Sequence, residues 1–307
     1  MRIVSLLASA TEIVCALGME KHLVGRSHEC DYPSSVLELP VCTGPRFDVN
    51  GSSREIDDRV KQSLVEATSV YHVDAELLRS LRPDVIVTQA QCAVCAVSER
   101  DVEEALKGTV ADGTAPRIVS LSPNNLADVW QNILQVADAL EITEVGRQLV
   151  ERLQDRVREI AAKANDQPVK PTVACLEWLD PLMAAGNWVP ELVGLAGGRN
   201  LVGTPGQHSP WLSMNELQTL YPDVIIALPC GFDLNRTRQD MAPLFRNADF
   251  CGLRAVREGR VYVTDGNQFF NRPGPRLVES LEILAEIIHP GVFTFNHQGS
   301  GWQQSCV

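Results

Sequence analysis

One charged, amphipathic run near the middle of the chain, residues 143–163, most constrains what this sequence can fold into. Its apolar residues recur every three or four positions, which puts a single stripe on one face of a helix. They are Val145, Leu149, Val150, Leu153, Val157 and Ile160. Thr143 is a suitable N-cap, and Pro168 stops the helix soon after Asn165. The pattern predicts a stiff helix, roughly 30 Å long, that joins two lobes.

The residues on the two sides of this run resemble one another, which favours two lobes over a single domain with a long surface helix. Residues 217–226 match 78–87 in two leucines, Pro-Asp-Val-Ile and a closing aliphatic residue, and residues 195–203 echo 17–25. Each side alternates short β-rich runs with helical periodicity, as in parallel strands joined by crossover helices. The predicted organisation is an N-terminal α/β lobe over 1–142, a linking helix over 143–165, a C-terminal α/β lobe over 166–290 and a loosely ordered tail over 291–307.

Charge and composition exclude several classes of partner. A net charge of −12 argues against nucleic acid and anionic membrane surfaces, which select for clustered Lys and Arg. Glu12 interrupts the apolar stretch at the start, and no apolar segment is long enough to span a bilayer, so we expect no membrane insertion. The nine scattered cysteines suit a reducing compartment better than a disulfide framework. We expect a cytoplasmic protein, or a periplasmic one if a leader has been removed.

Five stretches carry a resemblance to a known family. They are residues 2–12, 81–86, 191–198, 259–266 and 272–276, and they extend over nearly the whole chain up to Pro290. The chain resembles the cobalamin-type substrate-binding proteins of ABC importers. The resemblance implies the class III periplasmic-binding-protein fold, with two Rossmann-like α/β lobes and one backbone helix. It also implies a non-catalytic protein that binds a corrinoid, most simply cobalamin, in the cleft between its lobes.

The resemblance further implies partners and alternative ligands. Relatives with this architecture carry corrinoids, haem, iron chelates or bare metals. An ABC transporter permease is the implied protein partner, and glutamates at the lobe tips dock on it. Glu76 is the matching residue in the first lobe, and Glu216, beside Asn215, is its counterpart in the second. Little closure is expected, because a continuous helix resists bending.

Two polar clusters follow predicted strands of the first lobe, where open α/β sheets place their binding crevice. The candidate ligand residues there are His28, Glu29, Cys30, Gln91, Cys92 and Cys95. Thiolates and an imidazole could hold zinc or iron, and His28 could reach a corrinoid cobalt. The metal candidates are His28, Cys30, Cys92 and Cys95. The competing interpretation is small cysteines packed in the core.

The second lobe supplies aromatic candidates, because a flat and bulky ligand is held between aromatic faces. They lie in loops after predicted strands: Trp178, Trp188, Trp211, Phe232 and Phe270. Tryptophans are more often core residues than ligand contacts, and Trp130 has the spacing of helix core. Arg272 could contact ligand amides or phosphate, or it could brace its loop.

An enzyme is the rival class. Cys92-x-x-Cys95 before a helix could be a redox pair with a lowered thiol pKa. A thioredoxin-type pair belongs to a much smaller unit, however, and the sequence has no phosphate-binding glycine loop or hydrolase elbow. We therefore predict a binding protein that is not an enzyme.

Overall fold

The computed structural model describes residues 1–66, 70–90, 97–106 and 115–305, which fold into two compact units. Unit 1 consists of Met1–Gly51, Glu55–Pro123 and Ala127–Arg152. Unit 2 consists of Ser52–Arg54, Asn124–Leu126 and Leu153–Val307. The boundary falls inside the long helix α6, so the two units share this helix.

Helix α6 is Thr143–Asn165, as the periodicity predicts. Leu149, Val150 and Ile160 of the predicted stripe are buried, whereas Val145 is 41% exposed. Within unit 1, Gly146 lets α6 approach α5 (Leu126–Ala139) closely. A Cβ at Gly146 would overlap the Cβ of Ala137.

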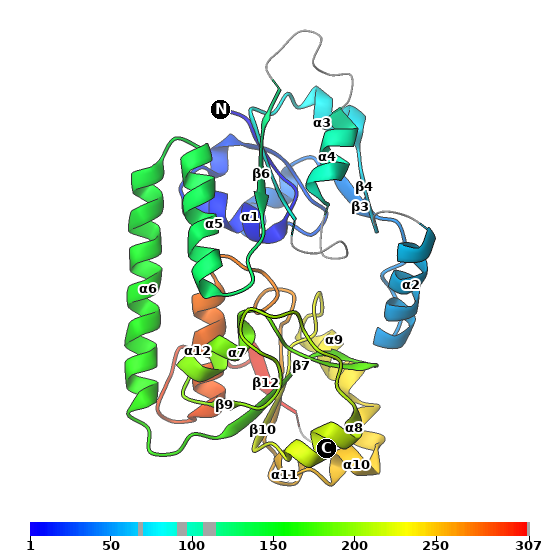
Figure 1. Cartoon of the computed structure of the whole chain (residues 1–307), viewed down its shortest axis with the longest axis vertical. Helices are drawn as coiled ribbons and strands as arrows, with labels where there is room; N and C mark the ends of the chain where they lie inside the picture. Colours follow the sequence, from blue (N-terminus) through cyan, green and yellow to red (C-terminus); the bar gives the residue numbers. More distant parts are fainter. Residues whose placement is uncertain (67–69, 91–96, 107–114, 306–307) are drawn as a thin grey trace. The chain divides into compact units, whose positions relative to one another are not determined.

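Unit 1 is built on a four-stranded parallel sheet with the order β2-β1-β5-β6. Its strands are β1 Ile3–Ser5, β2 Leu23–Arg26, β5 Val85–Gln89 and β6 Arg117–Leu121. Its other helices are α1 Ala8–Ala16, α3 Ala75–Ser80, α4 Glu99–Leu106 and α2 Ser53–Glu66, of which the first two residues belong to unit 2. Figure 1 shows α5 on one side of this sheet and α3 and α4 on the other. Leu78 of α3 and Val102 of α4 pack with Ile86 of the sheet.

A small antiparallel pair accompanies this sheet. It consists of β3 Thr43–Pro45 and β4 Tyr71–Val73, with Thr43 opposite Val73 and Pro45 opposite Tyr71. Cys42, Val70 and Tyr71 join the core cluster of unit 1. The pair therefore packs on the core of the unit.

Unit 2 has a six-stranded sheet with the order β12-β11-β10-β7-β8, and β9 also pairs with β7. The strands are β7 Thr172–Leu179, β8 Leu182–Ala184, β9 Arg199–Asn200, β10 Val224–Ala227, β11 Val261–Thr264 and β12 Trp302–Gln304. The helices are α7 Val189–Leu195, α8 Met214–Leu220, α9 Leu234–Met241, α10 Ala248–Cys251, α11 Arg254–Arg257 and α12 Leu277–Ile288. Figure 1 shows α7 and α12 on one side of the sheet and α8 to α11 on the other.

The C-terminal segment departs from the sequence prediction of a loose tail over 291–307. Strand β12 pairs antiparallel with β11 and extends the sheet. The indole Nε1 of Trp302 donates to Glu286 Oε2 at 2.7 Å, and the backbone N of Asn296 donates to Glu286 Oε1 at 2.8 Å. Both bonds go to Glu286 of α12, which lies outside the segment, so the sequence of residues 291–307 alone does not predict that the segment is ordered.

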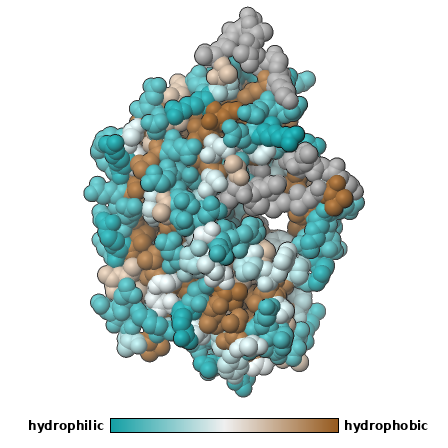
Figure 2. All heavy atoms as spheres, viewed as in Figure 1, coloured by the Kyte–Doolittle hydropathy of each residue, from teal (hydrophilic) through white to brown (hydrophobic). Residues whose placement is uncertain are grey.

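The surface is mainly polar. Figure 2 shows hydrophilic residues over most of one face, with apolar residues in small patches. Among the residues that the structure describes, no helix is both long enough and apolar enough to cross a membrane.

Candidate functional site

The carboxyl ends of the parallel strands in unit 1 carry the first group of candidates. Strand β2 ends at Arg26, and the backbone N of Ser27 donates to Ser5 O at 2.9 Å. His28 comes next and keeps part of its surface exposed. Its position agrees with the rule that ligands bind beyond the carboxyl ends of strands in open α/β sheets.

The imidazole of His28 is held by its neighbours. Nδ1 lies 2.8 Å from the hydroxyl of Thr43, and the ring lies 5.3 Å from that of Tyr71. Burial, followed by electrostatic repulsion from His72 and Arg26, lowers the pKa of His28 to about 4. The imidazole is therefore neutral at pH 7 and retains a lone pair.

Glu29 and Cys30 differ in their exposure. Glu29 is partly exposed, and its carboxylate accepts a long hydrogen bond from the Tyr71 hydroxyl at 3.5 Å. Cys30 has no exposed surface, and the Thr11 hydroxyl donates to its sulfur at 3.0 Å. In this structure Cys30 packs inside unit 1 and presents no surface to a ligand.

The candidate ligand residue Gln91 and the other two predicted metal ligands, Cys92 and Cys95, lie outside the described residues. Within the described ranges, no three His, Cys, Asp or Glu side chains lie close enough together to hold a metal ion. Zinc or iron binding by this set stays a prediction, and so does a redox role for the two cysteines.

Unit 2 presents aromatic rings at the corresponding edge of its own sheet. Trp178, near the end of β7, lies 5.2 Å from the ring of Phe232, which follows β10. The guanidinium of Arg236, in α9, lies 4.4 Å from the centre of the Phe232 ring. Phe232 is 6% exposed, whereas Trp178 is partly exposed. We call these three residues the aromatic cluster.

The loops after β10 and β11 are tied to each other beside this cluster. The side-chain amide of Asn271 donates to Leu228 O at 2.9 Å and to Gly266 O at 3.0 Å. A Cβ at Gly266 would overlap Pro229 O, so only glycine fits there. Burial, the largest influence, raises the pKa of Asp265, which begins the second loop.

Arg272 braces the loop after β11. It is 6% exposed, and its Nη2 donates to Asn267 Oδ1 at 3.0 Å. Arg276 does the same through Gln268 Oε1, also at 3.0 Å. The bracing role considered for Arg272 therefore agrees with its contacts, while ligand binding by this residue stays a prediction.

The other predicted aromatic residues separate into core and surface. Trp188 is 5% exposed and donates through Nε1 to Phe270 O at 2.6 Å, and Phe270 is fully buried. Both pack in unit 2 and do not face solvent in this structure. Trp211 is the opposite case at 57% exposed. Trp130 is buried in α5, as its spacing predicts.

Several residues that shape these edges were not among the predicted site residues. Thr43 and Tyr71 hold His28 through the pairing of β3 with β4, and Asn267 and Asn271 fix a loop of unit 2. The run Asp265-Gly-Asn-Gln after a strand is a signal that sequence reasoning could have used. Thr43 offers no such local signal.

The two predicted docking glutamates are both exposed but differ in their bonds. Glu76 is in the first turn of α3, whose N-cap Asp74 accepts from the backbone N of Leu77 at 2.9 Å. Glu216 forms a capping box with Ser213, since it accepts from Ser213 N at 2.8 Å and Oγ at 2.6 Å. These bonds lower the pKa of Glu216. Docking by either residue stays a prediction.

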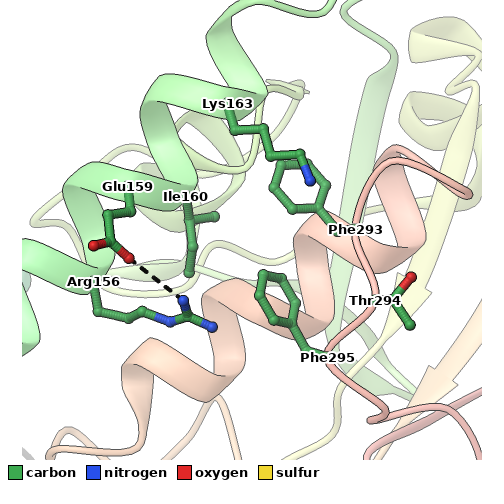
Figure 3. Close-up of a pocket in the computed structure, with 7 residues that line it drawn as sticks. All are labelled: Arg156, Glu159, Ile160, Lys163, Phe293, Thr294 and Phe295. Carbon is green, nitrogen blue, oxygen red and sulfur yellow. Dashed lines mark hydrogen bonds and ion pairs between the residues drawn. The ribbon is translucent and has the colours of Figure 1, made fainter.

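A separate groove of about 260 Å³ lies between α6 and the C-terminal segment of unit 2. It is lined by Arg156, Glu159, Ile160, Lys163, Phe293, Thr294 and Phe295. The two phenylalanine rings stack at 5.8 Å, and Lys163 lies 4.8 Å from the centre of one of them (Figure 3). None of the predicted ligand residues lines this groove. Its contacts tie the C-terminal segment to α6.

Comparisons with known proteins agree with this architecture. An uncharacterized ABC transporter substrate-binding lipoprotein, YvrC of Bacillus subtilis, is 24% identical over 95% of this chain and 81% of its own. The vitamin B12-binding protein of Vibrio cholerae is 24% identical over 92% of this chain and 86% of its own. The crystal structure of a periplasmic heme-binding protein from Pseudomonas aeruginosa matches with a TM-score of 0.70, at 22% identity over 94% of this chain and 93% of its own.

These matches bear on location and on family. Their descriptions as a lipoprotein and as a periplasmic protein do not support the cytoplasmic location expected from the cysteines. The fold is the predicted class III arrangement of two α/β lobes and a long helix. The model of the periplasmic binding protein family matches residues 3–267. The chain therefore belongs to the periplasmic binding protein family, whose members bind their ligands without catalysing a reaction.

Proposed function

We propose that this protein binds a corrinoid, with cobalamin as the first candidate, and delivers it to an ABC transporter permease. The observation that carries the proposal is the aromatic cluster of unit 2, in which Phe232 packs against the partly exposed ring of Trp178 and Arg236 packs over the ring of Phe232. A ring backed in this way offers a flat apolar face at little cost in entropy. The vitamin B12-binding relative supports the same ligand class.

Haem is the second candidate, and two observations favour it. The similar Pseudomonas structure is described as heme-binding. His28 provides a neutral imidazole, which is a common iron ligand. Corrinoids and haem share a flat tetrapyrrole around a metal, so the aromatic cluster suits either of them.

Calorimetric titration of the purified chain with cyanocobalamin, hydroxocobalamin and haemin tests the proposal. We expect saturable binding of at least one tetrapyrrole and at least about a 5-fold loss of affinity in Trp178→Ala, because an aromatic contact is worth about 1 kcal/mol beyond its buried area. A folded wild-type protein that binds none of the three would overturn the proposal.

Tyr221→Ala is the matched control. Tyr221 is 37% exposed, and the guanidinium of Arg254 lies 5.1 Å from the centre of its ring. Tyr221 precedes β10 and Arg254 precedes β11, so this second arginine–aromatic pair lies on the side of the sheet where these strands begin, opposite the aromatic cluster. We expect Tyr221→Ala to keep wild-type affinity. Equal losses in the two variants would argue against a specific role for the aromatic cluster.

A further inference from the structure

A short segment from the first half of the chain, Ser52–Arg54, forms part of unit 2 and contacts its partly exposed tryptophan. The indole Nε1 of Trp178 donates to Ser53 O at 3.2 Å, although the two residues lie 125 positions apart in the chain. The indole N–H is the only hydrogen-bonding group of a tryptophan side chain, and this bond uses it. A ligand that approaches Trp178 therefore meets the carbon atoms of the ring.

Two side chains of this segment fasten it to unit 2. The guanidinium of Arg54 forms an ion pair with Asp180, in which Nε donates to Oδ2 at 3.2 Å and Nη2 donates to Oδ1. The hydroxyl of Ser53 donates to the carboxylate of Asp240, in α9. Ser53 is 2% exposed, so little water competes for this bond. The carbonyl that accepts from Trp178 is thus held by two separate anchors.

The bond to Ser53 and the packing of Phe232 restrain different movements of the same ring. Phe232 lies 5.2 Å from Trp178 between ring centres, with 46° between the ring planes, and limits the tilt of the indole. The bond from Nε1 limits rotation of the indole within its own plane. A ring that is fixed before a ligand arrives loses less entropy on binding, which raises affinity.

We propose that Ser52–Arg54 is a positioning segment of the ligand site. The carbonyl of Ser53 orients the indole of Trp178, and the side chains of Ser53 and Arg54 hold that carbonyl in place. This inference rests on the proposed function and adds the part of the chain that preorganises the aromatic cluster.

Nuclear magnetic resonance of the indole N–H groups, in protein labelled with 15N-tryptophan, tests this contact without any ligand. The chain has five tryptophans, and Trp178→Phe identifies the signal of Trp178. In Ser53→Ala/Arg54→Ala we expect this signal to shift and to exchange its hydrogen about 10-fold faster, because one hydrogen bond and one ion pair that hold the acceptor are lost.

The signals of the other four tryptophans show in the same spectrum whether the variant keeps its fold, and we expect them to stay unchanged. Arg54→Ala alone keeps the buried hydroxyl of Ser53 and should give a smaller change in the same direction. A Trp178 signal with wild-type position and exchange rate in both variants would overturn the inference.

Calorimetric titration with cyanocobalamin, hydroxocobalamin and haemin tests whether the contact serves binding. We expect Arg54→Ala to bind the tetrapyrrole about 3- to 5-fold more weakly than the wild type, as befits an exposed ion pair. In Trp178→Phe, which lacks the indole N–H, adding Arg54→Ala should cause no further loss. Arg54→Lys keeps a charge for Asp180 but only one prong of the pair, so it should recover part of the affinity.

Two outcomes of the titration would overturn the positioning role. The first is an unchanged affinity in Arg54→Ala. The second is an equal loss from Arg54→Ala in the wild type and in Trp178→Phe, which would show that Arg54 acts on the ligand without Trp178.

Arg158→Ala is the matched control. Arg158 pairs with Asp155 in α6 of unit 2, and the side chains of this pair are about as exposed as those of Arg54 and Asp180. We expect wild-type affinity and a wild-type Trp178 signal in Arg158→Ala. The same losses as in Arg54→Ala would argue against a specific role for the segment. A wild type that binds no tetrapyrrole would remove the proposed function, and the indole signal would still decide whether Ser53 holds Trp178.

Discussion

The carboxyl edges of the two sheets are built alike but carry different chemistry. In unit 1, buried hydroxyls orient the imidazole of His28. In unit 2, Phe232 packs against the ring of Trp178, and Arg236 packs over Phe232. The first edge suits directional bonds, and the second suits contact with a flat apolar face. The fold thus determines where ligand residues stand, while the loops determine what they recognise.

The largest expected change in stability is at Trp188, which we predict to be a core residue, and we compare it with Trp178, which we predict to contact ligand. Trp188→Ala should lower the free energy of unfolding by about 3–5 kcal/mol, because it leaves a cavity and removes the bond to Phe270 O. Trp178→Ala should cost less than half as much, since Trp178 is partly exposed. Urea unfolding measures both values. Equal losses would show that Trp178 is also core, and would weaken the contrast between the edges.

The second prediction concerns the loops after β10 and β11 of unit 2, and asks whether their backbone tolerates an added side chain. Gly266→Ala forces a Cβ against Pro229 O, and we expect it to cost about 2–3 kcal/mol in unfolding free energy and to weaken ligand binding. Gly231→Ala is the control, because Gly231 has a φ of +75° but an added Cβ would meet nothing within 4 Å, and about 1 kcal/mol is expected. If both variants are equally stable, the loops tolerate backbone shifts and do not preorganise the site.

The smallest effect is a difference in the sign of pH dependence between two histidines. The pKa of His28 is lowered to about 4, so the native state binds fewer protons than the unfolded chain and loses stability as pH falls from 6.5 toward 4. The pKa of His297 in unit 2 is raised, chiefly by its hydrogen bond to Glu282 at 2.8 Å. The stability that protonated His297 contributes to the folded state is fully present below about pH 6.5 and is lost as the pH rises through the raised pKa.

Thermal unfolding of His28→Gln and His297→Gln beside the wild type measures this contrast. On acidification from about pH 8 to about pH 5, the advantage of the wild type over His28→Gln should shrink, whereas its advantage over His297→Gln should grow. Parallel trends for the two variants would contradict the opposite environments assigned to the two rings.

Local patterns in the sequence predict the elements better than they predict the site. The period of apolar residues gives α6 over Thr143–Asn165, and short aliphatic runs give the strands. Trp178 and Trp188 look alike in sequence, but a carbonyl 82 residues away makes one of them core. His28 depends in the same way on Thr43, 15 residues further along the chain. Such partners are set by the tertiary fold, which local periodicity does not encode.

The pairing of β12 with β11 has a consequence for self-association. An unpaired strand edge exposes a row of N–H and C=O groups that can recruit a strand from another molecule. Residues Trp302–Gln304 occupy that edge of β11 and are fastened through Glu286 of α12. Strand β12 is itself the last strand of the sheet, so the final segment replaces the edge of β11 by that of a strand of only three residues. Very short edge strands recruit other chains poorly, and a chain shortened before Trp302 would expose the edge of β11 to neighbouring molecules.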